Sequence, residues 1–492
     1  MARSIKEDEV TMEESVSYEP KRQENAVPAI DPEEERKVVR KLDRVIMPLM
    51  AIVYFFQYLD KQSINYAAVF DMSKDLNLTG SEFSWAVSLF YFGQLVSQYP
   101  AAYLMSRVRI TYFVGVAIVL WGGAEMCLAA SHAFSSIGAI RFLLGFFEGA
   151  VSPSFVIITS NWYCRREHPV RVATWVSMFG VSQIVGALMM YGVGGAEMSI
   201  QTWRVMFLLC GGLTVFAGVL FLWLMPRDTT TAWFLTETER KIATDRLARD
   251  RASGEKTNFD WSQAKEAVTD PRTLIYALMA LLITMPTAIV KFSSLVIQGF
   301  GFSKFQTMLV GLPGGAIAFS LVWIGALIPL KWPNARSFGG VLLCTVPMIG
   351  SLLLLTLPAS NSWGIVVSTW LAACTAPPLG IAVGLMASNV RGNTKKSVVG
   401  AIFFVLYCVG CIASPQLWQA EDAPRYIKGC ITSVVSWGLL IVVLLMFYFT
   451  ARLSNRRRDL GMGLGGGESE ETAITADSDL TERQDRGFRY TH

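Results

Sequence analysis

The chain has 492 residues, of which 52% are hydrophobic and only 17% are charged, and its formal net charge is +4. A soluble domain usually carries about 25% charged residues, so this composition argues against a chain of soluble domains. The small net charge also argues against a nucleic-acid-binding protein, which would carry a clustered basic surface.

The two ends of the chain differ from the rest in composition. Residues 1–44 and 452–492 are charged and poor in aromatic residues, and we expect most of both tails to be disordered. The N-terminal tail has no apolar stretch of the kind that signal peptides contain, so a cleaved signal peptide is not expected. The first membrane span would therefore direct the chain to the membrane.

Twelve apolar blocks follow one another between the tails. They begin near residues 46, 82, 111, 136, 171, 204, 273, 305, 337, 362, 396 and 430. A helix of roughly 20 apolar residues spans a hydrocarbon core of about 30 Å, and irregular backbone cannot face lipid. The sequence therefore predicts an all-α membrane protein with twelve transmembrane helices in two six-helix halves, 45–225 and 273–451. The polar stretch 226–272 is the expected cytosolic loop between the halves.

Lysine and arginine in the short loops set the orientation. With the N-terminus inside, the inner loops carry about twice as many of these residues as the outer loops, among them Arg107, Arg109, Arg391, Lys395 and Lys396. We therefore expect a multi-pass protein of the cell membrane with both termini in the cytoplasm. The sequon at Asn77 falls in an outer loop, so Asn77 is a candidate glycosylation site.

The first intramembrane charges are Asp60 and Lys61, more than ten residues into the first span. Neighbouring helix positions point about 100° apart, so the two side chains should enter different environments. Charges at the middle of a span cost about 2.5–3.5 kcal/mol on insertion scales, and such residues usually face a cavity or a partner.

Arg141 and Glu148 form a second charged pair of positions, in the fourth span. They lie two helical turns apart on one face, about 10 Å from each other. One interpretation is that these residues and the first-span charges form buried ion pairs between helices. The other is functional: carboxylates in a low dielectric can take up protons, and fixed cations can hold an anion.

Five further polar residues lie in or near other spans. Lys291 could extend to the outer surface or contact a substrate. Glu125 is interpreted chiefly as a hydrogen-bonding partner between helices, with a site role as the alternative. Gln183, Asn389 and Gln416 could hydrogen-bond within the bundle, as isolated polar residues in membrane helices commonly do.

Catalytic and metal-binding patterns are not found. Cys408 and Cys411 have redox-like spacing but lie in an apolar block without a second cysteine pair or a nearby histidine, so packing is the better interpretation. No nucleophile motif or phosphate-binding loop is present. We expect no enzyme activity, no cofactor and no metal.

Several segments between residues 40 and 455 resemble a known family. The first span carries LDKQSINYA, the fourth RFLLGFFEGAVSPSFVIITSNWY, and the later chain SNVRGNTKKSVVGA followed by SPQLWQAEDAPRY. These segments resemble the major facilitator superfamily, within it the anion:cation symporter group and its fungal allantoate-permease-like branch. The chain departs from the pattern near Ser106, in the loop after the second span where an aspartate is common in the superfamily, and at Ser293–Ser294, where a Leu-Pro pair is usual.

The resemblance implies a twelve-helix fold with alternating access. It implies that Asp60 and Glu148 match proton-coupling carboxylates and that Lys61 and Arg141 match cations on the substrate path. It also implies that Asn389 matches an asparagine near the central cavity. We count Lys291 with the substrate-binding candidates.

The leading hypothesis is a proton-coupled importer of a small organic anion, such as a carboxylate, a ureide or a vitamin acid. The expected partners are that anion, protons and the lipid bilayer, with no nucleic acid, and a monomer is expected. One alternative keeps the fold but exports a drug or secondary metabolite. Another is a membrane receptor that senses a nutrient without transporting it.

Overall fold

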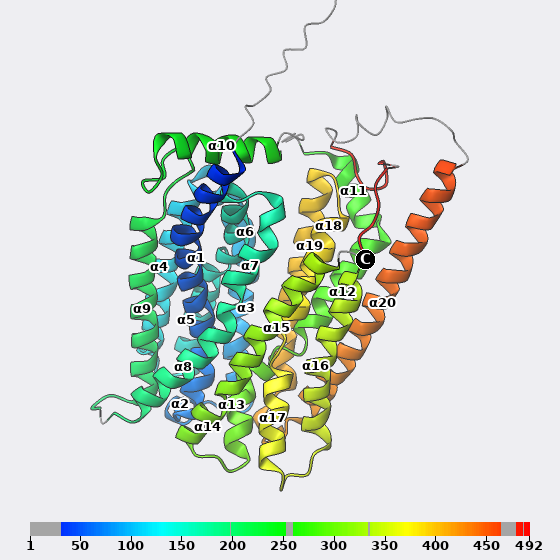
Figure 1. Cartoon of the computed structure of the whole chain (residues 1–492). Coiled ribbons are helices and arrows are strands. Elements are labelled where there is room, and N and C mark those ends of the chain that lie inside the picture. The colour runs from blue at the N-terminus through cyan, green and yellow to red at the C-terminus, as the bar shows by residue number, and fades with distance from the viewer. Residues whose placement is uncertain (1–30, 197, 252–258, 333–334, 464–478, 486) are drawn as a thin grey trace, which may run out of the picture.

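The computed structural model describes residues 31–196, 198–251, 259–332, 335–463, 479–485 and 487–492. Regular structure in these ranges is helical throughout (Figure 1). The helices before the central loop are α1 (Pro32–Val69), α2 (Met72–Asp75), α3 (Glu82–Arg107), α4 (Ile110–Leu128), α5 (Phe134–Glu148), α6 (Val151–Trp162), α7 (His168–Val176), α8 (Met178–Gly194) and α9 (Thr202–Leu224). The central loop contains α10 (Glu237–Arg251) and α11 (Trp261–Thr269).

The second set of membrane helices follows α11. It comprises α12 (Pro271–Thr284), α13 (Ile289–Gly299), α14 (Lys304–Val310), α15 (Leu312–Lys331), α16 (Arg336–Thr356), α17 (Ser362–Ala372), α18 (Ala376–Asn389), α19 (Asn393–Ala413) and α20 (Ile427–Gly463). Several expected spans are split into two helices in line, and Pro286 lies at the break between α12 and α13. A proline removes one backbone donor and favours such a break.

Eleven helical segments in the described ranges are long and apolar enough to cross a membrane. The twelfth expected span is α3, a continuous helix of 26 residues. Its apolar sequence is interrupted by the polar residues Gln94, Ser97 and Gln98. Gly93 and Gly145 let α3 and α5 pack closely, because a Cβ at Gly145 would lie 1.9 Å from the carbonyl oxygen of Phe90. Neighbouring helices thus cover the polar side of α3.

Helices α1–α9 pack mainly on one another, as do α12–α20 (Figure 1). We call the end of the bundle with α10 and α11 the terminal face and the end with α2 and α14 the opposite face. At the terminal face, Asp31 caps α1 by accepting a hydrogen bond from the backbone N–H of Glu33, 3.0 Å away. This cap starts α1 well before the first apolar block.

Helix α10 lies across the terminal face of the first half (Figure 1). Lys41 on α1 forms an ion pair with Glu239, with 2.6 Å between Nζ and Oε1. Arg246 is almost fully buried and contacts Glu167 at 3.0 Å. The central loop is therefore attached to the first half by charged side chains.

The expectation of disorder is wrong for residues 479–485 and 487–492, which we call the C-terminal strap. The strap lies beside α11, α12 and α20 at the terminal face (Figure 1). Thr481, Glu482, Asp485, Phe488 and Tyr490 are buried. Composition suggested a solvated tail, but the charges of the strap find partners in the folded chain.

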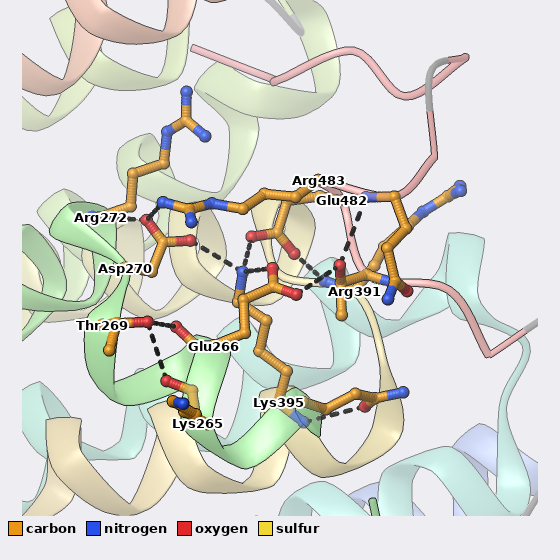
Figure 2. A network of polar contacts seen from close by, with 12 residues as sticks. Lys265, Glu266, Thr269, Asp270, Arg272, Arg391, Lys395, Glu482 and Arg483 are labelled. Atoms are coloured by element: carbon orange, nitrogen blue, oxygen red, sulfur yellow. Dashed lines mark hydrogen bonds and ion pairs between the residues drawn. The ribbon is translucent and has the colours of Figure 1, made fainter. Parts of the chain in front are cut away.

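Lys395 is the centre of the contacts that hold the strap (Figure 2). Its ammonium lies 2.8 Å from a carboxylate oxygen of Glu266 and 2.8 Å from one of Asp270, and it also contacts Glu482 of the strap. The three carboxylates are close enough together to hold a metal ion, but the ammonium of Lys395 lies among them.

The contacts around Lys395 change the pKa of the Asp270 carboxyl group. Burial alone would raise the pKa of the Asp270 carboxyl, but hydrogen bonds from Lys395 and from the backbone N–H of Arg272 lower the pKa below its ordinary value. Ionised Asp270 is thus part of the folded arrangement, which ties the strap to the start of α12.

Candidate functional site

Asp60 and Lys61 enter different surroundings, as their positions on α1 predict. Asp60 is fully buried, and its Oδ2 accepts hydrogen bonds from Trp121 Nε1 at 2.6 Å and Thr214 Oγ1 at 2.8 Å. These donors belong to α4 and α9. In the described part of the chain, no cation lies within ion-pair distance of Asp60.

Lys61 forms a buried ion pair with Glu148, with 2.7 Å between Nζ and Oε1. Glu148 is the last residue of α5, at the break before α6, and is fully buried. The side chain of Lys61 is 12% exposed. An unpaired charge at this depth is costly, so each of the two groups compensates the charge of the other.

Arg141 lies in the first half but does not pair with Glu148. It is buried, its Nε donates to the carbonyl oxygen of Ala86 at 3.4 Å, and its guanidinium lies 5.2 Å from the ring centre of Phe90. Among the described residues, no carboxylate lies within 4.0 Å of it. Arg141 and Glu148 are thus seven residues apart on α5 and do not form an ion pair with each other.

Lys291 joins the two halves at the middle of the bundle. Its Nζ donates to the carbonyl oxygen of Lys61 at 2.6 Å, and the residue is 6% exposed. The alternative that Lys291 extends to the outer surface is therefore wrong, because the side chain turns inward from α13. No described carboxylate lies within ion-pair distance of Lys291, so its charge lacks an anionic partner.

A cavity between the halves contains Lys61 and Lys291. Its lining combines these two cations with aromatic rings and hydroxyl groups: Tyr58, Tyr91, Phe179, Thr284, Thr287, Thr375 and Tyr407 are among the residues that line it. Glu148 reaches this group through its ion pair with Lys61. The cavity thus has two cations, one of them neutralised, and it offers hydrogen-bond donors beside apolar ring surface.

The structure does not bring Asn389 to this cavity, contrary to what the family resemblance implies. Asn389 ends α18 at the terminal face, and its Nδ2 donates to the carbonyl oxygens of Leu385 at 2.8 Å and Thr491 at 2.9 Å. Its Oδ1 accepts from the backbone N–H of Thr491 at 2.8 Å. The strap occupies both ends of the amide, so Asn389 holds the strap.

The contacts between the halves continue from Lys291 toward the opposite face. Asn65 Nδ2 donates to Ser294 Oγ at 2.9 Å, and Gln416 Nε2 donates to Ser88 Oγ at 2.9 Å. Near α2 and α14, Asp71 forms an ion pair with Lys304. Hydrogen bonds from Lys304 lower the pKa of Asp71 below its ordinary value, although partial burial opposes that shift.

Sequence reasoning missed several residues that shape the site. Tyr58 lies one turn before Lys61 on the same helix face, and this spacing could have identified it. Tyr91 and Tyr407 come from distant helices, and nothing local in the sequence marks them as cavity residues. Asn77 is exposed in the loop after α2, where its role as a glycosylation site stays a prediction.

Comparison with known proteins identifies the family. Residues 50–415 match the model of the Major Facilitator Superfamily. The chain belongs to this superfamily. Its fold is therefore the twelve-helix, two-half fold that the sequence predicts.

Two curated relatives cover nearly the whole chain. An uncharacterized transporter of Schizosaccharomyces pombe is 35% identical over 459 residues, which is 93% of this chain and 87% of the relative. The allantoate permease of Saccharomyces cerevisiae is 31% identical over 483 residues, 94% of this chain and 87% of that protein. The chain thus groups with fungal transporters related to allantoate permease.

Solved structures agree with the fold. The partially occluded, inward-open xylose transporter XylE from E. coli superposes with a TM-score of 0.60 at 10% identity, covering 82% of this chain and 98% of that one. A bacterial homolog of the human lysosomal transporter Spinster gives 0.59 at 13% identity, covering 86% and 97%. At these identities the likeness shows the fold alone.

Proposed function

We propose that this membrane transporter imports a small organic anion together with protons, across the cell membrane and with the terminal face in the cytoplasm. The observation that carries the proposal is the cavity cation Lys291. It is buried between the halves, and no carboxylate in the described ranges lies within 4.0 Å of it. A carboxylate substrate would supply the missing anion and would replace the carbonyl of Lys61 as a partner.

The lining of the cavity supports this substrate class. Lys61 and Lys291 come from different halves, so one anion placed between them would contact both. The tyrosines 58, 91 and 407 offer hydroxyl groups and ring faces to the remainder of the substrate. A compact carboxylate or ureido acid fits this combination of groups. One relative is an allantoate permease, and allantoate is a ureido acid.

Proton coupling would use the two carboxylates assigned from the sequence. Glu148 neutralises Lys61 in the present arrangement, so protonation of Glu148 would free the Lys61 ammonium for the substrate. Asp60 lies next along α1 and, within the described chain, has hydrogen-bond donors but no cation. Arg141 would keep a positive charge in the first half throughout the cycle. The proton and the anion would then enter together, and no unpaired charge would be left buried in the protein.

A radiolabelled uptake panel of small carboxylates and ureides, at two pH values, tests the proposal on purified protein in lipid vesicles. We expect one group of anions to accumulate, with uptake falling as the external pH rises. Extrusion from loaded vesicles without uptake would instead support the exporter. Saturable binding without flux in either direction would support the receptor.

A further inference from the structure

Glu125 on α4 is a fully buried carboxyl group in the first half, and the proposed function gives it no role. In the described ranges, no cation lies within ion-pair distance of it. The titratable groups that face it are Asp60 on α1, Arg141 and Glu148 on α5, and Cys210 on α9. Its nearest hydrogen-bonding partner is the hydroxyl of Ser63 on α1.

The hydroxyl of Ser63 makes two short contacts that one proton cannot satisfy. Ser63 Oγ lies 2.6 Å from the carbonyl oxygen of Asp60 and 2.6 Å from Oε1 of Glu125. Both distances are at the short end for O–H···O hydrogen bonds. A hydroxyl has one proton to donate, while a carbonyl and an ionised carboxylate only accept. With ionised Glu125, one of the two contacts would bring two lone pairs together.

A proton on Glu125 provides the second hydrogen-bond donor that these two contacts require. We infer that Glu125 is a carboxylic acid in this arrangement: it donates to Ser63 Oγ, and Ser63 donates to the carbonyl oxygen of Asp60. The surroundings of Asp60 differ, because Trp121 and Thr214 both donate to its carboxyl group. Of these two buried neighbours, Glu125 is therefore the one whose partner requires it to donate.

These two hydrogen bonds hold α1 at Asp60, next to the cavity residue Lys61. The carbonyl that it holds belongs to Asp60, and the following residue is Lys61, whose own carbonyl accepts from Lys291. Glu125 is thus a positioning residue, which acts through Ser63 on the segment that carries the proposed proton and substrate sites. Glu125 is not among the residues that line the cavity.

Four variants separate this role from simple packing. Glu125→Gln keeps a donor of similar shape in the amide group, whereas Glu125→Leu removes it. Ser63→Ala breaks the chain of hydrogen bonds. Ser182→Ala is the matched control, because Ser182 is also fully buried and its hydroxyl donates only to a backbone carbonyl three residues earlier, that of Phe179 at 2.8 Å.

Infrared spectroscopy of the full chain in lipid vesicles near neutral pH gives the direct readout. We expect a carbonyl-stretch band of a protonated carboxylic acid that Glu125→Gln abolishes, Ser63→Ala shifts and Ser182→Ala leaves in place. In melting experiments we expect Glu125→Gln to keep a Tm near that of the wild type and Glu125→Leu to lower the Tm by about 1–3 °C. An unchanged band in Glu125→Gln, or equal destabilisation by both substitutions, would overturn the inference.

Only the transport measurement rests on the proposed function. We expect maximal uptake per folded protein to fall by about tenfold or more in Glu125→Leu and Ser63→Ala, with Gln at position 125 restoring it. Equal uptake in Leu and Gln variants would refute the positioning role. If the wild-type protein takes up no anion, the proposed function fails, while the infrared and melting results still decide the protonation of Glu125.

Discussion

Lys291 donates a hydrogen bond to the carbonyl oxygen of Lys61, 2.6 Å away, and so connects the two halves at the edge of the central cavity. A backbone carbonyl is a weaker partner for an ammonium group than a carboxylate is. A substrate carboxylate can therefore displace it, and the displacement would release one contact between the halves.

Replacement of Lys291 should weaken substrate binding. For Lys291→Gln we expect the KM of anion uptake to rise by about tenfold or more, because one charge-assisted hydrogen bond contributes about 1.5–3 kcal/mol. Lys331→Gln, at the end of α15 outside the cavity, is the control and should leave the KM unchanged. An unchanged KM in Lys291→Gln would rule out this lysine as the anion contact.

Replacement of Glu148 should separate transport from the proton gradient. Glu148→Gln cannot lose or gain a proton, so we expect uptake to lose its dependence on external pH and the anion to stop accumulating against its gradient. Exchange of labelled for unlabelled anion should persist in the same vesicles. Accumulation and pH dependence that survive the substitution would show that Glu148 is not the coupling group.

The Asp71–Lys304 ion pair predicts an acid-sensitive contact at the opposite face. The pKa of Asp71 is lower in the folded protein than its ordinary value of about 3.9, so the contact is fully present above that value. It is lost as the pH falls through the lowered folded-state pKa. Distance measurements between spin labels on α2 and α14 should show the halves parting there in acid. In Asp71→Asn the distance should already be altered at neutral pH and should not change with acid.

The Lys395 cluster predicts a strong dependence of stability on the strap. Lys395→Gln leaves three carboxylates together without their shared cation. Removing one partner of a buried ion pair costs about 3–5 kcal/mol, so we expect the Tm to fall by about 3–5 °C. Asp459→Asn removes a carboxylate that pairs with Arg489 at the exposed rim of the strap, and it should change the Tm little. Equal effects of the two substitutions would contradict the central role of Lys395.

A chain that ends before residue 479 gives a second test of the strap. Without the strap, Asn389, Lys395 and Arg458 lose the contacts that they make with it, and hydrogen exchange should rise in the loop between α18 and α19. A synthetic peptide of residues 479–492 should restore protection, and the same peptide with Glu482→Lys should not. If both peptides restore protection equally, the Lys395–Glu482 contact does not specify the docking.

The membrane class, the helical fold and the presence of charges inside the spans are all evident in the amino-acid sequence. Apolar blocks of roughly 20 residues leave a chain in lipid few alternatives to helices. A helix repeats every 3.6 residues, so the period alone also predicted that Asp60 and Lys61 would point to different surroundings. Both inferences use only distances along one helix.

Which of these charges meet depends on how the helices pack against one another. The pair Lys61–Glu148 and the contact of Lys291 with Lys61 join helices far apart in the chain, and no local pattern gives the rotation of one helix against another. The position of Asn389 near the central cavity is implied by the family resemblance alone, and the disorder of the tail is inferred from its composition alone; neither takes account of the docking of the strap. Its charges look solvated in the sequence, but Glu482 is buried because Lys395, 87 residues away, compensates its charge.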